Sequence, residues 1–266
     1  MPKKFIPTAW NAGEYPSSEL AQLIILAYLN DDFILPIIYG PPRIGKSVYA
    51  LKVLFQVYDF LLGWDRFRVY EECIGYEPER VINAWGSFNQ RMPGYIWDDA
   101  GCWLFTLDYH DPLLKEIQRY FNVLATDLNC LILTTPDPKW ILTKIGKMPG
   151  SMWIKIIKTR GVQRHPETGR RILDTYVPSV RFARRAYTYQ PWRAPDMKKE
   201  GVRTLVEDDF YCMMEEDIYQ YYKPQREYYA GLVKGRMREE MHRAVQQKKL
   251  KDARVKKQLQ DMDQHG

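Results

Sequence analysis

The feature that most constrains this chain is a short segment that fits the pattern G-x-x-x-x-G-K-[ST]. The segment reads Gly40-Pro41-Pro42-Arg43-Ile44-Gly45-Lys46-Ser47. An apolar run over 33–39 precedes it, and a run without glycine or proline follows it to Leu62. A strand, a tight loop and a helix are therefore expected in that order, with glycines where the backbone approaches closely or takes a positive φ.

A loop of this kind at the start of a helix is suited to bind phosphate groups. Its backbone N–H groups converge, and the helix dipole adds partial positive charge at the same point. Lys46 is expected to reach the β- and γ-phosphates of a nucleotide, and the Ser47 hydroxyl to bind Mg²⁺. The expected nucleotide-contacting residues are Gly40, Pro41, Pro42, Arg43, Ile44, Gly45, Lys46, Ser47 and Val48.

Two adjacent aspartates follow a second apolar run, Gly94-Tyr95-Ile96-Trp97. A carboxylate at the end of such a strand can hold the Mg²⁺ of a bound nucleotide, and we assign this role to Asp98. A second carboxylate can orient and deprotonate an attacking water, and we assign this role to Asp99. An apolar run that ends in two acids is also typical of a strand that leads into an exposed turn.

Residues 131–135 are expected to form a buried strand that ends in hydroxyl groups. Because side chains alternate along a strand, only one of Thr134 and Thr135 can face the nucleotide. We favour Thr135 as the residue that contacts the γ-phosphate, because it lies nearer the end of the strand. The alternative is that both threonines merely end the strand.

The pattern of elements predicts an α/β fold with a five-stranded, mostly parallel sheet, in which residues 67–70 form the second strand. We divide the chain into three parts. Residues 1–160 form the core, residues 161–195 a basic β-hairpin extension, and residues 196–266 a helical C-terminal region with a basic tail.

The charge of +6 is concentrated in two segments. Residues 151–195 contain 10 Lys and Arg against 2 Asp and Glu, and residues 234–257 contain 10 against 3. Basic segments beside a mildly acidic core indicate a polyanionic partner. Over 180–189 arginines alternate with aromatic residues, which suits DNA because cations bind phosphates and rings stack on bases. A strand with one buried and one solvated face would show the same alternation.

Several classes of protein are disfavoured by the sequence. No apolar run approaches the roughly 18 residues of a membrane span, and the basic start over 1–7 leads to no signal core. We therefore expect a cytoplasmic protein with no membrane partner. The four cysteines and four histidines are too scattered for a zinc or redox motif.

With these motifs in place, residues 17–160 resemble the core of a P-loop NTPase of the ASCE division, most like the AAA+ ATPases. The matching features are a leading helix capped at Ser17-Ser18, the loop over 40–47, the acidic pair at 98–99 and the threonines at 134–135. The resemblance implies an ATPase that assembles into a ring or another oligomer and uses ATP and Mg²⁺ to act on DNA or protein. The organisation also resembles small DNA-handling ATPases of archaeal viruses and plasmids.

Some features depart from that family. AAA+ cores are followed by a helical lid that carries an arginine, whereas this chain continues with a basic, strand-like segment. The place expected for an arginine finger holds Lys144 and Lys147, and Arg119 and Arg160 are the other candidates for a trans-acting cation. Asp99 stands where most relatives have glutamate, and it is shorter by one methylene.

The expected function is therefore hydrolysis of Mg-ATP coupled to work on DNA, such as replication, loading, packaging or partition. The alternative is a nucleotide-switched assembly protein with little turnover. A small-molecule phosphotransferase is disfavoured because residues 60–150 contain no Arg-rich lid. A morphogenesis ATPase at the membrane is disfavoured because no membrane span is found.

Overall fold

The computed structural model describes residues 18–85, 91–105, 112–158, 163–164, 171–172, 183–193 and 200–263. The helices are α1 (Glu19–Leu29), α2 (Lys46–Leu62), α3 (Arg66–Glu72), α4 (Pro78–Trp85), α5 (Pro112–Tyr120), α6 (Thr143–Gly146) and α7 (Glu216–Asp263), with 3₁₀ turns η1 (Ala100–Cys102), η3 (Leu124–Thr126) and η4 (Pro138–Trp140). The strands are β1 (Leu35–Tyr39), β2 (Ile74–Gly75), β3 (Tyr95–Trp97), β4 (Leu131–Thr135), β5 (Ser151–Lys158), β6 (Gln163–Arg164), β7 (Arg171–Ile172), β8 (Ala183–Arg193) and β9 (Glu200–Tyr211). The chain divides into two compact units, Met1–Met214 and Glu215–Gly266.

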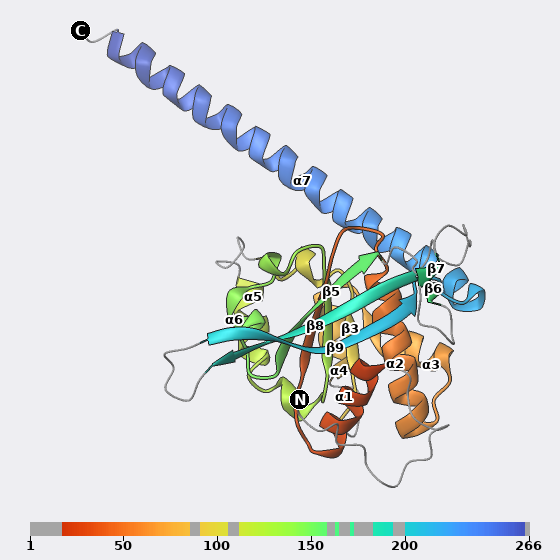
Figure 1. The fold of residues 1–266 in the computed structure, drawn as a ribbon. Coiled ribbons are helices and arrows are strands. Elements are labelled where there is room, and N and C mark those ends of the chain that lie inside the picture. The colour runs from red at the N-terminus through yellow and green to blue at the C-terminus, as the bar shows by residue number, and fades with distance from the viewer. Residues whose placement is uncertain are drawn as a thin grey trace. The chain divides into compact units, whose positions relative to one another are not determined.

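The fold of the first unit is α/β, built on a seven-stranded mixed sheet with the order β2-β3-β4-β1-β5-β8-β9. Figure 1 shows the long strands β8 and β9 beside β5. The five strands from β2 to β5 in this order are parallel to their neighbours, as expected. Strands β8 and β9 then extend the sheet in antiparallel fashion. The sheet therefore continues past residue 160, where the sequence predicts the core to end.

The core lies between the sheet and its helices, and it is built from aliphatic and aromatic residues. Ile37 and Ile38 of β1, Ile132 of β4 and Ile154 of β5 are all buried. Helix α1 begins at a cap in which Ser18 Oγ accepts the N–H of Ala21, as the sequence predicts. Helix α2 also has the predicted bounds, and it ends where Gly63 adopts a left-handed conformation.

The second strand was predicted at residues 67–70, and this prediction is wrong. These residues lie in α3. Its N-cap is Asp65, whose side chain accepts the N–H of Arg68. The helix buries Val69 and Tyr70 on one side. The strand is the short β2, which starts immediately after Cys73 and pairs with β3. A four-residue run of β-formers did not reveal this, because the N-cap at Asp65, two residues before the run, decides the local structure.

The prediction of a helical region over 196–266 is wrong for its first part, because Glu200–Tyr211 forms β9. Asp208 and Phe210 of β9 face α1 and α2, whereas Asp209 between them faces the opposite side. The buried residue at one of these positions is an acid, Asp208, so the sequence shows no alternation of apolar and polar residues there. The segment therefore resembles an acidic, tyrosine-rich helix. The hairpin expected within 161–195 is represented by the antiparallel pair β6–β7, and its turn lies outside the described residues.

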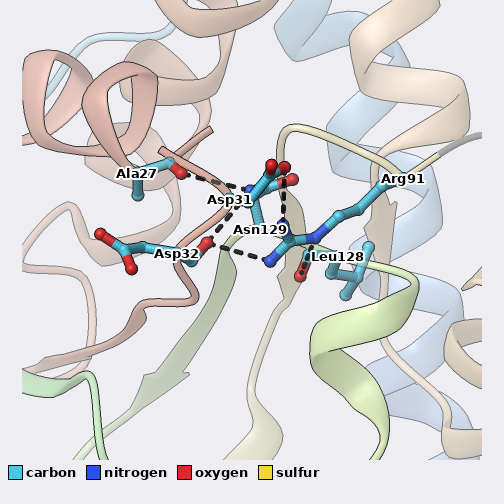
Figure 2. A network of polar contacts seen from close by, with 6 residues as sticks. All are labelled: Ala27, Asp31, Asp32, Arg91, Leu128 and Asn129. Carbon is cyan, nitrogen blue, oxygen red and sulfur yellow. Dashed lines mark hydrogen bonds and ion pairs between the residues drawn. The ribbon is translucent and has the colours of Figure 1, made fainter. Parts of the chain in front are cut away.

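A polar network lies at the end of the sheet where β1, β3 and β4 begin (Figure 2). Arg91 donates to the carbonyls of Asp32 and Leu128 and to the Asp31 carboxylate. Asn129 Nδ2 donates to the carbonyls of Ala27 and Asp32. The network supplies side-chain donors to backbone carbonyls in the segments that lead into these strands. In sheets of this kind a ligand usually binds at the opposite end, where the parallel strands finish.

The second unit consists mainly of α7, a polar helix of 48 residues that lies within the region predicted to be helical. Tyr221, Tyr228 and Met241 are exposed large apolar side chains on this helix. None of the helices in the described ranges has a stretch long and apolar enough to cross a bilayer.

Candidate functional site

The loop between β1 and α2 has the backbone geometry that its glycines allow. Gly40 has φ of 148° and Gly45 has φ of 106°, and both values strain a residue with a side chain. Arg43 also has a positive φ, 63°. Gly45 is the N-cap of α2 and provides no side-chain acceptor for the first N–H groups of the helix. The start of a helix carries partial positive charge, so this position is favourable for an anion.

Lys46 is buried at the start of α2 and bends back over the loop. Its Nζ donates to the carbonyls of Gly40 at 3.0 Å and Pro41 at 3.2 Å. The ammonium group therefore lies against the backbone carbonyls of the loop, close to the start of α2. A positive charge, a helix N-terminus and a narrow loop meet at one point, which is favourable for a phosphate.

Asp98 and Ser47 lie 51 residues apart in the chain and meet in the fold. The Ser47 hydroxyl donates to Asp98 Oδ1 at 2.8 Å, and the Thr134 hydroxyl donates to the same oxygen at 2.6 Å. Strand β4 lies between β1 and β3, so the end of β4 bridges the two. Asp98 is fully buried, and burial of a carboxylate requires such hydrogen-bond donors. Three oxygen-bearing side chains therefore converge beside the loop.

Asp99 is half-buried and starts the turn after β3. Its φ is 52°, an unusual value for a residue other than glycine. Its backbone N–H donates to Thr134 Oγ1 at 2.8 Å. Thr134 therefore fixes both aspartates, one through the carboxylate and one through the backbone.

Thr135, which the sequence analysis favoured, points away from this cluster. Its hydroxyl donates to the Asp137 carbonyl at 3.0 Å, and its side chain packs on Gly101. Strand alternation is the physical reason, because it sends adjacent side chains to opposite faces. The residue nearer the end of the strand is thus not the one that faces Asp98.

Tyr39 immediately precedes the loop. Burial raises the pKa of this phenol, and the nearby Tyr189 and Asp137 raise it further. The side chain therefore stays neutral over the physiological pH range. Of the two arginines considered as trans-acting residues, Arg119 is exposed and pairs with Glu116 at 2.5 Å, and Arg160 lies outside the described residues.

The extension of the sheet brings two further residues to the loop. Arg184 of β8 donates from Nε to the Ile44 carbonyl at 3.0 Å. Cys212, just after β9, packs against Gly45 so closely that a Cβ on this glycine would lie 2.7 Å from Cys212 Cβ. Sequence reasoning assigned the strand of Arg184 to DNA contact and gave Cys212 no role. In the structure every second residue from Arg184 to Thr188 is buried, and this alternation separates the two faces of the strand.

No protein-family model matches the chain, and no solved structure matches it. The chain is similar to uncharacterized protein B-251 of Sulfolobus spindle-shape virus 1, with 27% identity over 184 residues. The matched region covers 66% of this chain and 72% of that protein. This similarity carries no activity with it, so the function is inferred from the geometry of the site.

Proposed function

We propose that this chain binds Mg-ATP at the loop over residues 40–47 and hydrolyses the bond between its β- and γ-phosphates. The observation that carries the proposal is the 2.8 Å contact between Ser47 Oγ and Asp98 Oδ1. Mg²⁺ prefers oxygen ligands, and in nucleotide sites it usually binds one or two protein oxygens together with phosphates and waters. Ser47 and Asp98 fit that donor set.

In the proposed complex the loop amides and Lys46 hold the phosphates. Lys46 exchanges its contacts with the carbonyls of Gly40 and Pro41 for phosphate oxygens, since an ammonium group binds anionic oxygens more strongly than neutral carbonyls. Ser47 and Asp98 hold Mg²⁺. The metal, when bound, neutralises charge that develops on the phosphate oxygens.

The proposed reaction is in-line attack by water on the γ-phosphorus. The new P–O bond forms as the bond to the β–γ bridging oxygen breaks, and ADP and inorganic phosphate are released. Asp99 orients the water and accepts its proton. Thr134 takes the place first given to Thr135, because it fixes both Asp98 and Asp99. The assignment to the AAA+-like group of the ASCE P-loop NTPases, with assembly into a ring or another oligomer, is part of this proposal.

DNA is the proposed partner, and the face of the sheet opposite α1 and α2 supports it. Lys155 of β5 is exposed and pairs in register with Tyr187 of β8. The rings of Tyr187 and Tyr189 lie nearly parallel, with their centroids 6.4 Å apart. Rings beside an exposed cation suit unpaired bases and their phosphates. Arg185 on the same face is not counted, because Asp209 and Glu207 compensate its charge.

The test is ATP hydrolysis by the full chain and by Lys46→Ala, with Lys115→Ala on the exposed side of α5 as the matched control. Nucleotide binding is measured in parallel with a fluorescent ATP analogue. Loss of a charge-stabilising group in such a site lowers turnover by roughly 100-fold or more. We expect that loss in Lys46→Ala and no loss in Lys115→Ala. Equal turnover in Lys46→Ala and the wild type would refute the proposed site.

The same assay separates the alternative function and the DNA partner. Tight ATP binding with single-turnover kinetics and nucleotide-dependent assembly, followed by sedimentation, would indicate a nucleotide-switched assembly protein. Turnover is also measured with single-stranded and double-stranded DNA at several salt concentrations. We expect salt-sensitive stimulation by single strands that weakens in Tyr187→Ala. A rate that DNA leaves unchanged, together with no salt-sensitive binding, would remove DNA as the partner and leave the nucleotide site intact.

A further inference from the structure

Arg184 is a buried arginine whose side chain reaches the loop. Only 6% of this residue is exposed. Its Nε donates to the Ile44 carbonyl at 3.0 Å, and its Nη1 donates to the Ala183 carbonyl at 2.8 Å. Burial of a guanidinium group is costly unless its donors find acceptors. This chain therefore places a buried cation where it contacts the backbone of the loop, 140 residues away in sequence.

The contact determines the direction of one backbone amide. In a planar trans peptide the C=O and the following N–H point in opposite directions. The Ile44 carbonyl points to Arg184, so the N–H of Gly45 points away from Arg184. Gly45 has no side chain and has φ of 106°, so this peptide unit can rotate more easily than most. The bond from Arg184 limits that rotation.

Other residues of the same strand pair hold the first turns of α2. The ring of Phe210 packs on Tyr49 with centroids 4.8 Å apart. Lys52 Nζ donates to the Tyr211 carbonyl at 3.0 Å. Cys212 packs on Gly45. Strands β8 and β9 therefore form one side of the loop's surroundings, and the parallel strands form the other.

We propose that Arg184 is a positioning residue for the nucleotide site, and that it aims the Gly45 amide at a phosphate group. The proposal rests on the proposed function, because it requires a nucleotide at the loop. Arg184 orients the Gly45 N–H by holding the Ile44–Gly45 peptide. Its positive charge also lowers the electrostatic cost of bringing a triphosphate to the loop. The antiparallel extension is then part of the ATP site as well as a surface for a partner.

A purely structural role for Arg184 makes a different prediction. In that case its removal lowers the free energy of unfolding but leaves the nucleotide affinity of the folded protein unchanged. The neighbouring Arg185 provides the matched control. It lies on the same strand with its side chain on the opposite face, where its Nε donates to Asp209 at 2.7 Å.

The experiment compares the full-length wild type with Arg184→Met, Arg184→Lys and Arg185→Met. Kd values for Mg-ADP and Mg-ATP are measured by calorimetry below the unfolding temperature of each variant, which is determined separately without nucleotide. A hydrogen bond to a charged group is worth enough to change affinity by roughly 10-fold or more. We expect that loss in Arg184→Met. Lysine keeps the charge but cannot donate to both carbonyls from a planar fork, so we expect a smaller loss in Arg184→Lys.

A second readout reports on the amide itself. In protein labelled with ¹⁵N-glycine, the Gly45 amide resonance should move downfield when Mg-ADP binds to the wild type and to Arg185→Met. In the Arg184 variants this shift should be reduced. It needs no turnover, and a role in folding alone would not remove it.

The outcomes separate the two proposals. If the wild type binds no nucleotide, the proposed function fails. If the wild type binds nucleotide and the folded Arg184 variants bind it equally well with the same Gly45 shift, the positioning role is overturned. If Arg184→Met does not fold, Arg184→Lys decides by the same two measurements.

Discussion

Ser47 Oγ donates to Asp98 Oδ1 across 2.8 Å, and this bond joins the first turn of α2 to the end of β3. A hydroxyl and a carboxylate at this distance can share one hard cation, and they keep each other's orientation when no cation is bound. The Thr134 hydroxyl adds a second donor to the same carboxylate oxygen. The pair is thus preorganised from one side by the helix and from the other by β4.

Replacing Asp98 by asparagine should remove the Mg²⁺ dependence of nucleotide binding. The amide oxygen can still accept from Ser47 and Thr134, so the fold should survive, but the negative charge that attracts the cation is lost. The measurement is the Kd for ATP with Mg²⁺ and with EDTA. Asp59→Asn, at an exposed position on α2, is the control and should keep the difference between the two conditions. A Mg²⁺ effect of the same size in Asp98→Asn would contradict the assignment.

Replacing Thr134 by valine should lower turnover much more than the same change at Thr135. Both side chains are buried on β4, so the two variants lose similar packing. Only Thr134 bonds to Asp98 and to the Asp99 amide. We expect a loss of roughly 10- to 100-fold in the ATPase rate of Thr134→Val, measured at saturating Mg-ATP. A larger loss in Thr135→Val would restore the role first expected for that residue.

Cys212 should be protected from alkylation by bound nucleotide, because it packs against Gly45 of the loop. Burial raises the pKa of Cys73 to about 12 and raises that of Cys130 well above its usual value. Both stay protonated at pH 8, so only Cys102 and Cys212 should react in the folded protein. Mass spectrometry of Cys102→Ser, with and without Mg-ADP, measures the rate at Cys212. An unchanged rate at saturating nucleotide would mean that the ligand lies elsewhere.

Asp208 should be important for stability, because it is a buried carboxylate that joins three elements. It accepts from Ser18 Oγ and the Glu19 amide at 2.7 Å and from the Tyr49 hydroxyl at 2.5 Å. Asp208→Ala should lower the free energy of unfolding by about 2–4 kcal/mol. Asp209→Ala, at an exposed ion pair on the same strand, should lower it by less than about 1 kcal/mol. Urea denaturation of both variants is the measurement, and equal losses would contradict this account.

Stability should decrease as the pH rises above about 10, the usual pKa of a tyrosine in an unfolded chain. Burial raises the pKa of Tyr58 well above that value in the folded state, and burial followed by the Asp208 charge does so for Tyr49. The unfolded state then loses protons that the folded state retains, so alkaline pH favours unfolding. Unfolding curves from pH 8 to 11.5 measure the slope. Tyr58→Phe should make it shallower, and Tyr228→Phe, at an exposed position, should not.

The sequence by itself determined the elements that depend on local signals. The loop over 40–47, the helix that follows it and the strands predicted at 33–39 and 131–135 were found because glycine positions, capping residues and apolar runs act over a few residues. Asp98 was found for the same reason, since it ends an apolar strand. Its contact with Ser47 depends on how the parallel strands are placed side by side, so the structure was needed to show it.

The tertiary structure alone decided which residues complete the site. The rotation of β4 between its neighbours decides whether Thr134 or Thr135 faces Asp98. The local sequence does not predict this rotation. Arg184 reaches the loop because β8 adds to β5 in one register, and a slip by one residue would have turned it to the other face. Contacts between segments 140 residues apart are set by the packing of the whole sheet. They therefore leave no trace in the order of residues along either segment.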